Sequence, residues 1–600
     1  KYSEKFGDKT VILMQLGNFY ELCAVLEGSI HYGELDIHNI CDNLLNISVA
    51  KKKNKTNKSS LPTGEEVRYL QAGFPLPSRE KFVPILLEHG YTVVIVDQIT
   101  EPPNPERKVT EIVSPGTSIQ SNSNKTNYLV SIYIEKYKYK GNDSYTVGVS
   151  SIDLSTGKNY YHDIKHDVDE NYWSDEISRL LNFYEPTELL IQLDNINCKL
   201  QDLINRWDIR TLSIQFNYFK DSIYKKPSYQ NEFLNRIFKL NSMTSPLDFF
   251  NLNRKIQSTL SYVYMIVYIY EHKSDILQNI EYPQEYKIKD YLTLHSNSIR
   301  QLNIVNNYSY YRGKNESLYE ICNCCNTSMG RRNLKERMLY PLLDPIIIEQ
   351  RYDKITYFDT HTEPIQSILN NISDLEKMLR IMSLDLLEPY DIYSTSLSYK
   401  YVYILFEKFN TSIFLKGYDK LIDKFREYLH TLNETFSWDI MINSPSTQQP
   451  RSIFLKNIFL DIDEIDNNIE INLSHLTLLS TYLSKYIDSK NNNCLKWSED
   501  KQDTWYIYCT NKRSQTFKQN IKNTCLDKFK IIVDSKLLFE IDIKSINYRK
   551  MDKSSTIIEF PDVLNISKNL KKYYKQLSKL NKKYYNIKIK ELYEEYSPSL

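Results

Sequence analysis

Two long amphipathic segments in the last third of the chain constrain its fold most strongly. The first, with a break near Asn472, places apolar residues at alternating spacings of three and four: Ile458, Ile462, Ile465, Ile469, Leu476, Leu479 and Leu483. The second repeats the alternation: Leu570, Tyr573, Leu577, Leu580, Tyr584 and Ile587. Such seams are typical of helices that pack along each other. They predict two long paired helices, with the residues between them folded at one end of the pair.

The segment between the two seams contains strand candidates and a basic stretch. Residues 504–510, 539–543 and 556–560 read as strands of a small sheet. Lys512, Arg513, Lys518 and Lys522 follow the first strand with no acidic residue between Thr510 and Cys525. This predicts a positive surface that holds phosphates without reading sequence. The alternative is that these residues are only the exposed start of a helix.

Length and composition set the class of protein. A chain of 600 residues exceeds one hydrophobic core and predicts several domains. The net charge of +1 means that nucleic-acid contacts come from local patches. No apolar run approaches the roughly 18 residues of a membrane span, so we expect no membrane partner. The nine cysteines lack a second ligand pair at zinc spacing, which predicts no metal site and fits a reducing, intracellular compartment.

The N-terminal region begins with a strand and a tight corner. The apolar run Val11–Leu16 suits a buried strand, and the glycine and asparagine after it predict a turn. If the backbone then stays extended, Phe19 and Glu21 point to the same side. In the alternative, Phe19 and Tyr20 pack inward and Glu21 caps a helix that Leu22 begins.

The rest of this region alternates strands and helices over about 115 residues. Residues 78–88 predict a helix with Gly90 just beyond its end, and residues 91–96 a strand. The lysine-rich residues 51–58 read as a flexible basic loop, either solvated or in contact with phosphates.

A second α/β region is predicted from residue 127 to about residue 240. Its elements read as strands over 128–133, 145–153, 158–163 and 189–191 and a helix over 174–182. This order, with three strands before the helix, is that of RNase H-like folds. Asp153 invites a nuclease hypothesis, but two-metal hydrolysis needs several convergent carboxylates, and the sequence does not assemble that set.

Beyond Met243 the periodicity is helical. A basic helix face is predicted at Arg331, Arg332, Lys335 and Arg337, interpreted as a solvated part of a scaffold.

Four motifs in series resemble the N-terminal domain of the DNA mismatch repair protein MutS family. They are Gly17-Asn18-Phe19-Tyr20-Glu21-Leu22, Ala72-Gly73-Phe74-Pro75, Gly90-Tyr91-Thr92-Val93 and Ser114-Pro115-Gly116-Thr117. Later blocks are similar to the MutS connector and core: Asp153-Leu154-Ser155-Thr156-Gly157, Pro186-Thr187-Glu188, Thr327-Ser328-Met329-Gly330-Arg331-Arg332-Asn333-Leu334 and Asp374-Leu375-Glu376-Lys377-Met378-Leu379-Arg380. Ser114 and Asn18 depart from the residues usual in the family.

The resemblance implies a multidomain α+β chain with roles for each part. It implies a small mixed α/β mismatch-recognition domain (1–120), an RNase H-like connector (121–242), a mainly helical core with the first lever helix (243–488), a β clamp (489–562) and the returning lever helix (563–600). Phe19 and Glu21 are then the mismatch readers, and the partner is double-stranded DNA with mispairs or small loops. The resemblance is also compatible with the viral or organellar type of MutS protein.

The resemblance also implies chemistry beyond these residues. No Gly-x-x-x-x-Gly-Lys-Ser/Thr loop is present, so ATP phosphates have no recognisable cradle. Known MutS proteins carry an ATPase after the second lever. We therefore expect a fragment with no catalytic residue, cofactor or metal of its own, taken from a DNA-dependent ATPase that uses ATP and Mg²⁺. Family members act as homodimers, whereas the fragment alone is compatible with a monomer.

Two other functions stay open at this point. One is a MutS-like protein that binds branched or recombining DNA, against which the pair Phe19 and Glu21 counts because such relatives typically lack it. The other is a metal-dependent nuclease built on the second α/β region around Asp153.

Overall fold

A computed structural model describes most of the chain, in two units. The described residues are 2–27, 30–33, 37–52, 67–100, 103–119, 126–139, 141–164, 172–211, 213–218, 223–286, 291–305, 317–359, 362–409, 419–443, 451–488, 493–500, 504–523, 527–533 and 536–600. The first unit is Lys1–Leu386 with Tyr401–Leu405, and the second is Leu387–Lys400 with Phe406–Leu600. No helix among the described residues is long and apolar enough to cross a membrane.

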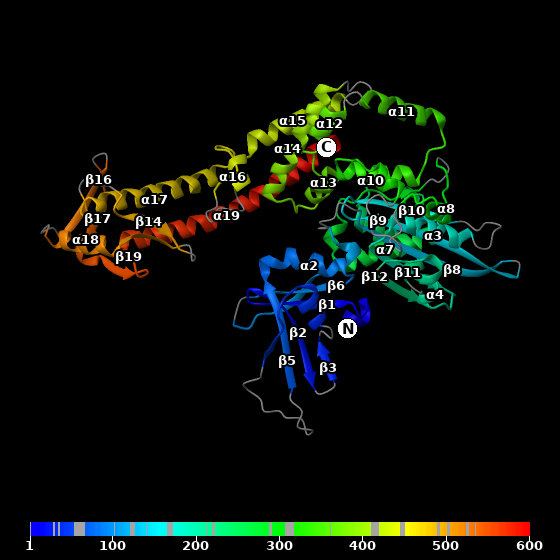
Figure 1. Ribbon diagram of the computed structural model, residues 1–600, viewed down its shortest axis with the longest axis horizontal. Helices are drawn as coiled ribbons and strands as arrows, with labels where there is room; N and C mark the ends of the chain where they lie inside the picture. The colour runs from blue at the N-terminus through cyan, green and yellow to red at the C-terminus, as the bar shows by residue number, and fades with distance from the viewer. Residues whose placement is uncertain are drawn as a thin grey trace. The chain divides into compact units, whose positions relative to one another are not determined.

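The first unit begins with a sheet in the order β4-β5-β2-β1-β6-β7, with β3 paired to β2. Its elements are α1 (Tyr2–Phe6), β1 (Thr10–Leu16), β2 (Phe19–Glu27), β3 (Ile30–Gly33), β4 (Ala50–Lys52), β5 (Val67–Pro75), α2 (Arg79–Glu88), β6 (Thr92–Gln98) and β7 (Arg107–Val113). β1 is parallel to β6, and the other pairs are antiparallel. Val83, Leu86 and Leu87 of α2 belong to the buried cluster on one face (Figure 1).

The predicted corner is present, but the helix proposed to begin at Leu22 is wrong. β2 continues as a strand to Glu27. Tyr20, Leu22 and Ala24 are buried while Phe19 is exposed, which is the two-residue period of a strand with one covered face. The predicted helix over 78–88 and the strand over 91–96 are confirmed by α2 and β6. The basic loop predicted at 51–58 lies, from residue 53 onward, outside the described residues.

The second sheet of the first unit has the order β12-β11-β8-β9-β10-β13. Its elements are β8 (Tyr128–Tyr139), β9 (Asn142–Asp153), β10 (Lys158–Ile164), α3 (Tyr172–Tyr184), β11 (Glu188–Asp194), α4 (Leu200–Trp207), β12 (Ser213–Tyr218) and β13 (Gln284–Glu285). One face packs against α3 and α4, and the other against α7 (Ile256–His272), α5 (Pro227–Phe238) and α6 (Pro246–Phe249). The predicted order of three strands, a helix and a strand is confirmed.

The helical character predicted beyond Met243 is confirmed across both units. After α7 the helices are α8 (Ser296–Gln301), α9 (Leu318–Cys322), α10 (Ser328–Leu339), α11 (Pro345–Asp359), α12 (Thr362–Leu369), α13 (Leu375–Ser383), α14 (Pro389–Lys408), α15 (Asp419–Thr435) and α16 (Trp438–Asn443).

Two long helices form an arm in the second unit: α17 (Leu460–Ser484) and α19 (Pro561–Tyr596). They run side by side in Figure 1. Five of the seven residues predicted for the first seam are buried: Ile462, Ile469, Leu476, Leu479 and Leu483. The gap in the apolar spacing near Asn472 does not interrupt the helix: α17 is continuous there, and the Asn472 amide donates to the Asn468 carbonyl at 2.7 Å.

Of the six residues predicted for the second seam, only Leu570 and Leu577 lie on the buried face of the helix. The buried face of α19 consists of Val563, Ile566, Ser567, Leu570, Tyr574, Leu577, Asn581, Tyr585, Ile589, Leu592 and Tyr596. The predicted Ile587 is 43% exposed. The pattern misled because a polar residue occupies the buried stripe, where the Asn581 amide donates to the Arg451 carbonyl at 2.8 Å.

The end of the arm carries a small tip with one helix and six described strands (Figure 1). Its elements are β14 (Lys496–Glu499), β15 (Trp505–Thr510), α18 (Asn511–Asn523), β16 (Lys528–Val533), β17 (Lys536–Asp542), β18 (Asn547–Lys550) and β19 (Ser555–Glu559). The buried Trp505 stacks on Tyr574 of α19 with ring centroids 5.2 Å apart, and Trp497 Nε1 donates to Thr477 Oγ1 of α17 at 3.1 Å. The three strands predicted here are confirmed.

Candidate nucleic-acid interface

The corner between β1 and β2 is a two-residue turn. Gly17 adopts a positive φ of 62°, a conformation that favours glycine, and Leu16 pairs directly with Phe19. The turn is fixed from two neighbouring segments. Leu76 N–H donates to the Asn18 carbonyl at 2.9 Å, and Arg107 Nε donates to the Gln15 carbonyl at 2.9 Å. Phe19 therefore begins a strand whose backbone is held on both sides.

The residues after the turn separate as the extended alternative predicted. Phe19 is 46% exposed, whereas Tyr20 is 6% exposed and packs into the cluster under α2. Glu21 lies on the same sheet face as Phe19, between Met14 of β1 and Gly73 of β5 in the strand register. Ile12 and Met14, both 39% exposed, share this face. The corner thus presents an exposed aromatic ring, with the half-buried Glu21 beside it, on a partly exposed sheet face.

Buried polar contacts fix the tyrosine between these two residues. Tyr20 Oη donates to Asp97 Oδ1 at 2.6 Å. Burial, reinforced by the Asp97 carboxylate, raises the pKa of Tyr20 to about 12, so its hydroxyl keeps the proton at neutral pH. Nearby, Glu111 pairs with Arg79 and with Lys273, whose Nζ lies 2.8 Å away. Burial alone would raise the pKa of Glu111, but the two cations outweigh it and lower that pKa.

The four basic residues predicted to meet phosphates all lie on α18. Ser514, Phe517 and Ile521 form the buried face of this helix, at spacings of three and four. Lys512, Lys518 and Lys522 are exposed and Arg513 is half-buried. Lys518 Nζ lies 4.1 Å from the ring centroid of Tyr548, a cation–π contact that orients its stem. All four residues lie outside the buried side of this one helix, and the set Lys512, Arg513, Lys518 and Lys522 is called the basic face below.

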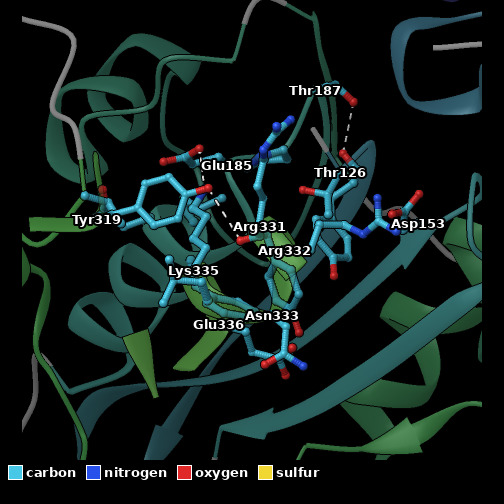
Figure 2. Close-up of a pocket in the computed structure, with 18 of the residues that line it drawn as sticks. Thr126, Asp153, Glu185, Thr187, Tyr319, Arg331, Arg332, Asn333, Lys335 and Glu336 are labelled. Carbon is cyan, nitrogen blue, oxygen red and sulfur yellow. Dashed lines mark hydrogen bonds and ion pairs between the residues drawn. The ribbon is translucent and has the colours of Figure 1, made fainter. Parts of the chain in front are cut away.

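A pocket of about 1190 Å³ lies between α10 and the second sheet, within the first unit. The quoted motifs of the middle of the chain meet at its walls: Thr156 and Lys158 after β9, Pro186 and Thr187 before β11, Met329 to Arg337 of α10, and Glu376 of α13. Figure 2 shows Asp153, Glu185, Arg331, Arg332 and Lys335 around it. Segments that are distant in sequence thus meet around this pocket, and the region where they meet is called the joint below.

Ion pairs fasten this joint, and for Arg332 and Lys335 they correct the interpretation of Arg331, Arg332, Lys335 and Arg337 as a solvated face. Arg332 pairs with Asp374 at 2.6 Å and with Glu376 at 2.6 Å, and Glu376 also binds Lys158 at 2.9 Å. Lys335 Nζ lies 2.7 Å from Glu185 Oε2. Burial opposes the charge of Asp374, yet Arg332 lowers its pKa. Two of the four cations, Arg332 and Lys335, are thus paired with carboxylates, Arg331 Nε donates to the Cys325 carbonyl at 3.2 Å, and Arg337 is exposed.

Asp153, the residue behind the nuclease hypothesis, is buried and caps its own turn. Its Oδ1 accepts from the Ser155 backbone N–H at 2.9 Å and from Ser155 Oγ at 2.6 Å. In the described part of the chain, no group of three or more histidine, cysteine, aspartate or glutamate side chains is placed to hold a metal ion. These contacts give Asp153 a role in the turn after β9.

Sequence reasoning missed two partners of the corner. Asp97, which binds Tyr20, and Gly73, which adjoins Glu21, belong to strands β6 and β5. Gly73 stands in a quoted motif, but only the strand register shows which residue it faces. A partner set by sheet pairing has no local signal in sequence.

The fold therefore defines a multidomain chain of two α/β sheets, a helical region and a helical arm with two small sheets at its tip, one of four strands and one of two. The chain belongs to the MutS family: the model for MutS domain I matches residues 40–122 and the model for MutS domain III matches residues 297–594, together more than half of the chain.

Individual relatives agree with this assignment. A putative DNA mismatch repair protein, a MutS homolog of Acanthamoeba polyphaga mimivirus, is 27% identical over 97% of this chain and 54% of its own length. The DNA mismatch repair proteins MutS of Flavobacterium psychrophilum and Caldanaerobacter subterraneus are each 26% identical, over 64% and 70% of this chain and 39% and 45% of their own lengths. The chain spans about half the length, or less, of these curated relatives.

Proposed function

We propose that this chain is the mismatched-DNA binding part of a MutS-type DNA mismatch repair protein. One observation carries the proposal: Phe19 stands 46% exposed at the start of a fixed strand, on the same face as Glu21, while Tyr20 between them is buried. An exposed aromatic ring on a rigid support is suited to enter a weakened base step, because the support does not yield when the ring meets the stack.

The wedge would discriminate by deformability. Pushing an apolar side chain between base steps costs a few kcal/mol of stacking, and the cost is least where pairing is already defective. Bending a site of this size costs about 1–6 kcal/mol more, again less at a softened step. A mispair therefore gains affinity without any sequence being read. Glu21 would add a hydrogen bond to an edge of the displaced base and repel a well-stacked duplex.

The basic face on α18 would hold the same duplex by its phosphates. Three of its four cations are exposed, and no acidic residue interrupts the helix. Each phosphate that is neutralised adds ~0.9 to the salt slope of binding and nothing to mismatch preference. In this proposal the tip is a clamp, the arm consists of levers, and the second sheet is an RNase H-like connector. The proposal includes five parts: the mismatch-recognition domain 1–120, the connector 121–242, the core with the first lever 243–488, the clamp 489–562 and the returning lever 563–600.

For the whole protein we propose ATP binding and hydrolysis with Mg²⁺ and a homodimeric state. No described residue is assigned to ATP, to Mg²⁺ or to a catalytic step.

Competition binding with the purified chain tests the proposal. A labelled duplex with one mispair is competed with the matched duplex, with the mispaired duplex and with a four-way junction of the same length. We expect the mispaired duplex to compete best. Equal competition by matched and mispaired duplexes would refute mismatch sensing, and a stronger junction would favour a protein for branched DNA.

A further inference from the structure

Gly73 of β5 lies directly across from Glu21 of β2, and the fit there is close. A Cβ atom built on Gly73 would lie 3.0 Å from Glu21 Cγ, 3.2 Å from Glu21 Cα and 2.5 Å from the Tyr20 carbonyl oxygen. Gly73 does not adopt a positive φ. Glycine is therefore required at this position by the space that Glu21 and its strand occupy, and not by the backbone conformation of residue 73.

The Glu21 carboxylate is unusual for an acidic group at a sheet surface. Its Oε2 is enclosed and has no hydrogen-bond partner among the described residues. Its neighbour on the other side is Met14, whose side chain offers no N–H or O–H. An enclosed carboxylate oxygen without a donor is unfavourable. Glu21 thus gains when a donor, such as an N–H on a base edge, comes within reach.

We propose that Gly73 is a positioning residue for Glu21: by lacking a side chain, it lets the carboxylate lie low over β5 and stay unpaired until a displaced base supplies a donor. This inference rests on the proposed function and adds a specificity-determining residue to it. Phe19 pairs with Pro75 instead, so the position of the wedge does not depend on Gly73.

A double-mutant cycle tests the inference in the full chain. The variants are Gly73→Ala, Glu21→Ala and the two combined, and the measurement is the ratio of Kd for a matched duplex to Kd for a duplex with one mispair. If Gly73 acts through Glu21, all three variants lower the ratio by the same factor, about threefold to tenfold, because residues in contact are not additive. Independent factors that multiply in the double variant would overturn the inference.

A matched glycine controls for general loss of stability. A Cβ on Gly116 would lie 2.8 Å from Glu188 Cβ, in a contact that does not involve Glu21. Gly116→Ala should lower Tm and leave the ratio unchanged. A fall in the ratio equal to that of Gly73→Ala would mean that any strained glycine has this effect, which would also overturn the inference.

Shortening Glu21 supplies the decisive rescue if Gly73→Ala folds poorly. Glu21→Ala removes the Cγ that meets the new Cβ at 3.0 Å, so the Gly73→Ala/Glu21→Ala variant should recover part of the Tm lost by Gly73→Ala. No recovery would show that the Tyr20 carbonyl alone demands glycine, and Gly73 would then have no role through Glu21. The proposed function fails separately, if Phe19→Ala and Glu21→Ala both leave the ratio unchanged.

Discussion

The corner and the basic face on α18 both carry exposed side chains, but the chemistry of these side chains differs. The corner sets a ring and one carboxylate on an apolar sheet face, with its polar contacts made beneath by Tyr20. The basic face sets cations on a helix whose apolar side is buried. An apolar wedge responds to how easily a duplex deforms, whereas cations respond to its charge. Under the proposed function, mismatch preference and phosphate binding are therefore separable, and each has its own experimental signature.

The largest effect is expected from the basic face. Lys512→Ala, Lys518→Ala and Lys522→Ala combined should weaken binding by about a hundredfold at moderate salt and reduce the salt slope by up to ~2.7, if each lysine neutralises one phosphate. Matched and mispaired duplexes should lose affinity equally. Titrations at several salt concentrations measure both quantities.

Three lysines on the same arm provide the control for location. Lys575, Lys579 and Lys582 of α19 are also exposed. Their combined replacement by alanine should change the salt slope much less. An equal loss would place the phosphate contacts along the arm and would break the separation of phosphate binding from mismatch preference.

Phe19→Ala should have the next largest effect, confined to preference. Stacking of an aromatic side chain on a base contributes ~1–3 kcal/mol, so the ratio of matched to mispaired Kd should fall by about tenfold or more. Affinity for the matched duplex should change little. Phe249→Ala is the matched control, since Phe249 is 43% exposed on α6. If both variants give the same ratio as the unaltered chain, Phe19 is not the reader.

Glu21→Gln should have a smaller effect with a distinctive sign. Gln keeps the length of the side chain but removes the charge that repels phosphates, so matched duplex should bind more tightly and the ratio should fall by about threefold. Glu80→Gln, on α2 at the opposite face of the sheet, should not change the ratio. Tighter binding of both duplexes by one common factor would reduce Glu21 to a general repulsive charge.

Local periodicity was enough to predict part of the corner. The turn and the shared side of Phe19 and Glu21 depend only on the residues themselves and on the period of a strand. The continuation of β2 was lost because a short apolar run such as Leu22–Leu26 suits either element. Asp97 and Gly73 could not be assigned as partners, because sheet register over 50 or more residues places them.

The same limit explains the errors in the helical regions. Arg332 reads as a surface residue until Asp374 and Glu376, over 40 residues later, are seen to pair with it. The buried stripe of α19 includes Asn581, which a search for apolar spacing skips. Burial of polar groups with distant partners is a tertiary property that a single-sequence pattern does not carry.

Tyr20→Phe should have the smallest effect. It tests whether the buried Tyr20 only stabilises the corner, while the exposed Phe19 and Glu21 beside it set the ratio of Kd values. The variant loses the hydrogen bond to Asp97, which should lower the free energy of unfolding by about 1 kcal/mol, and leaves the ratio of Kd values unchanged. Because the pKa of Tyr20 is raised to about 12 in the folded chain, its stabilisation is complete below pH 10 and is lost as the pH rises from 10 to about 12. The difference in stability between the unaltered chain and Tyr20→Phe should therefore shrink over that window, as measured by denaturant unfolding at each pH. A difference that stays constant would mean that the hydroxyl does not hold its proton against Asp97. A changed ratio at neutral pH would mean that Tyr20 takes part in reading, and that the support and the surface of the corner are not separable.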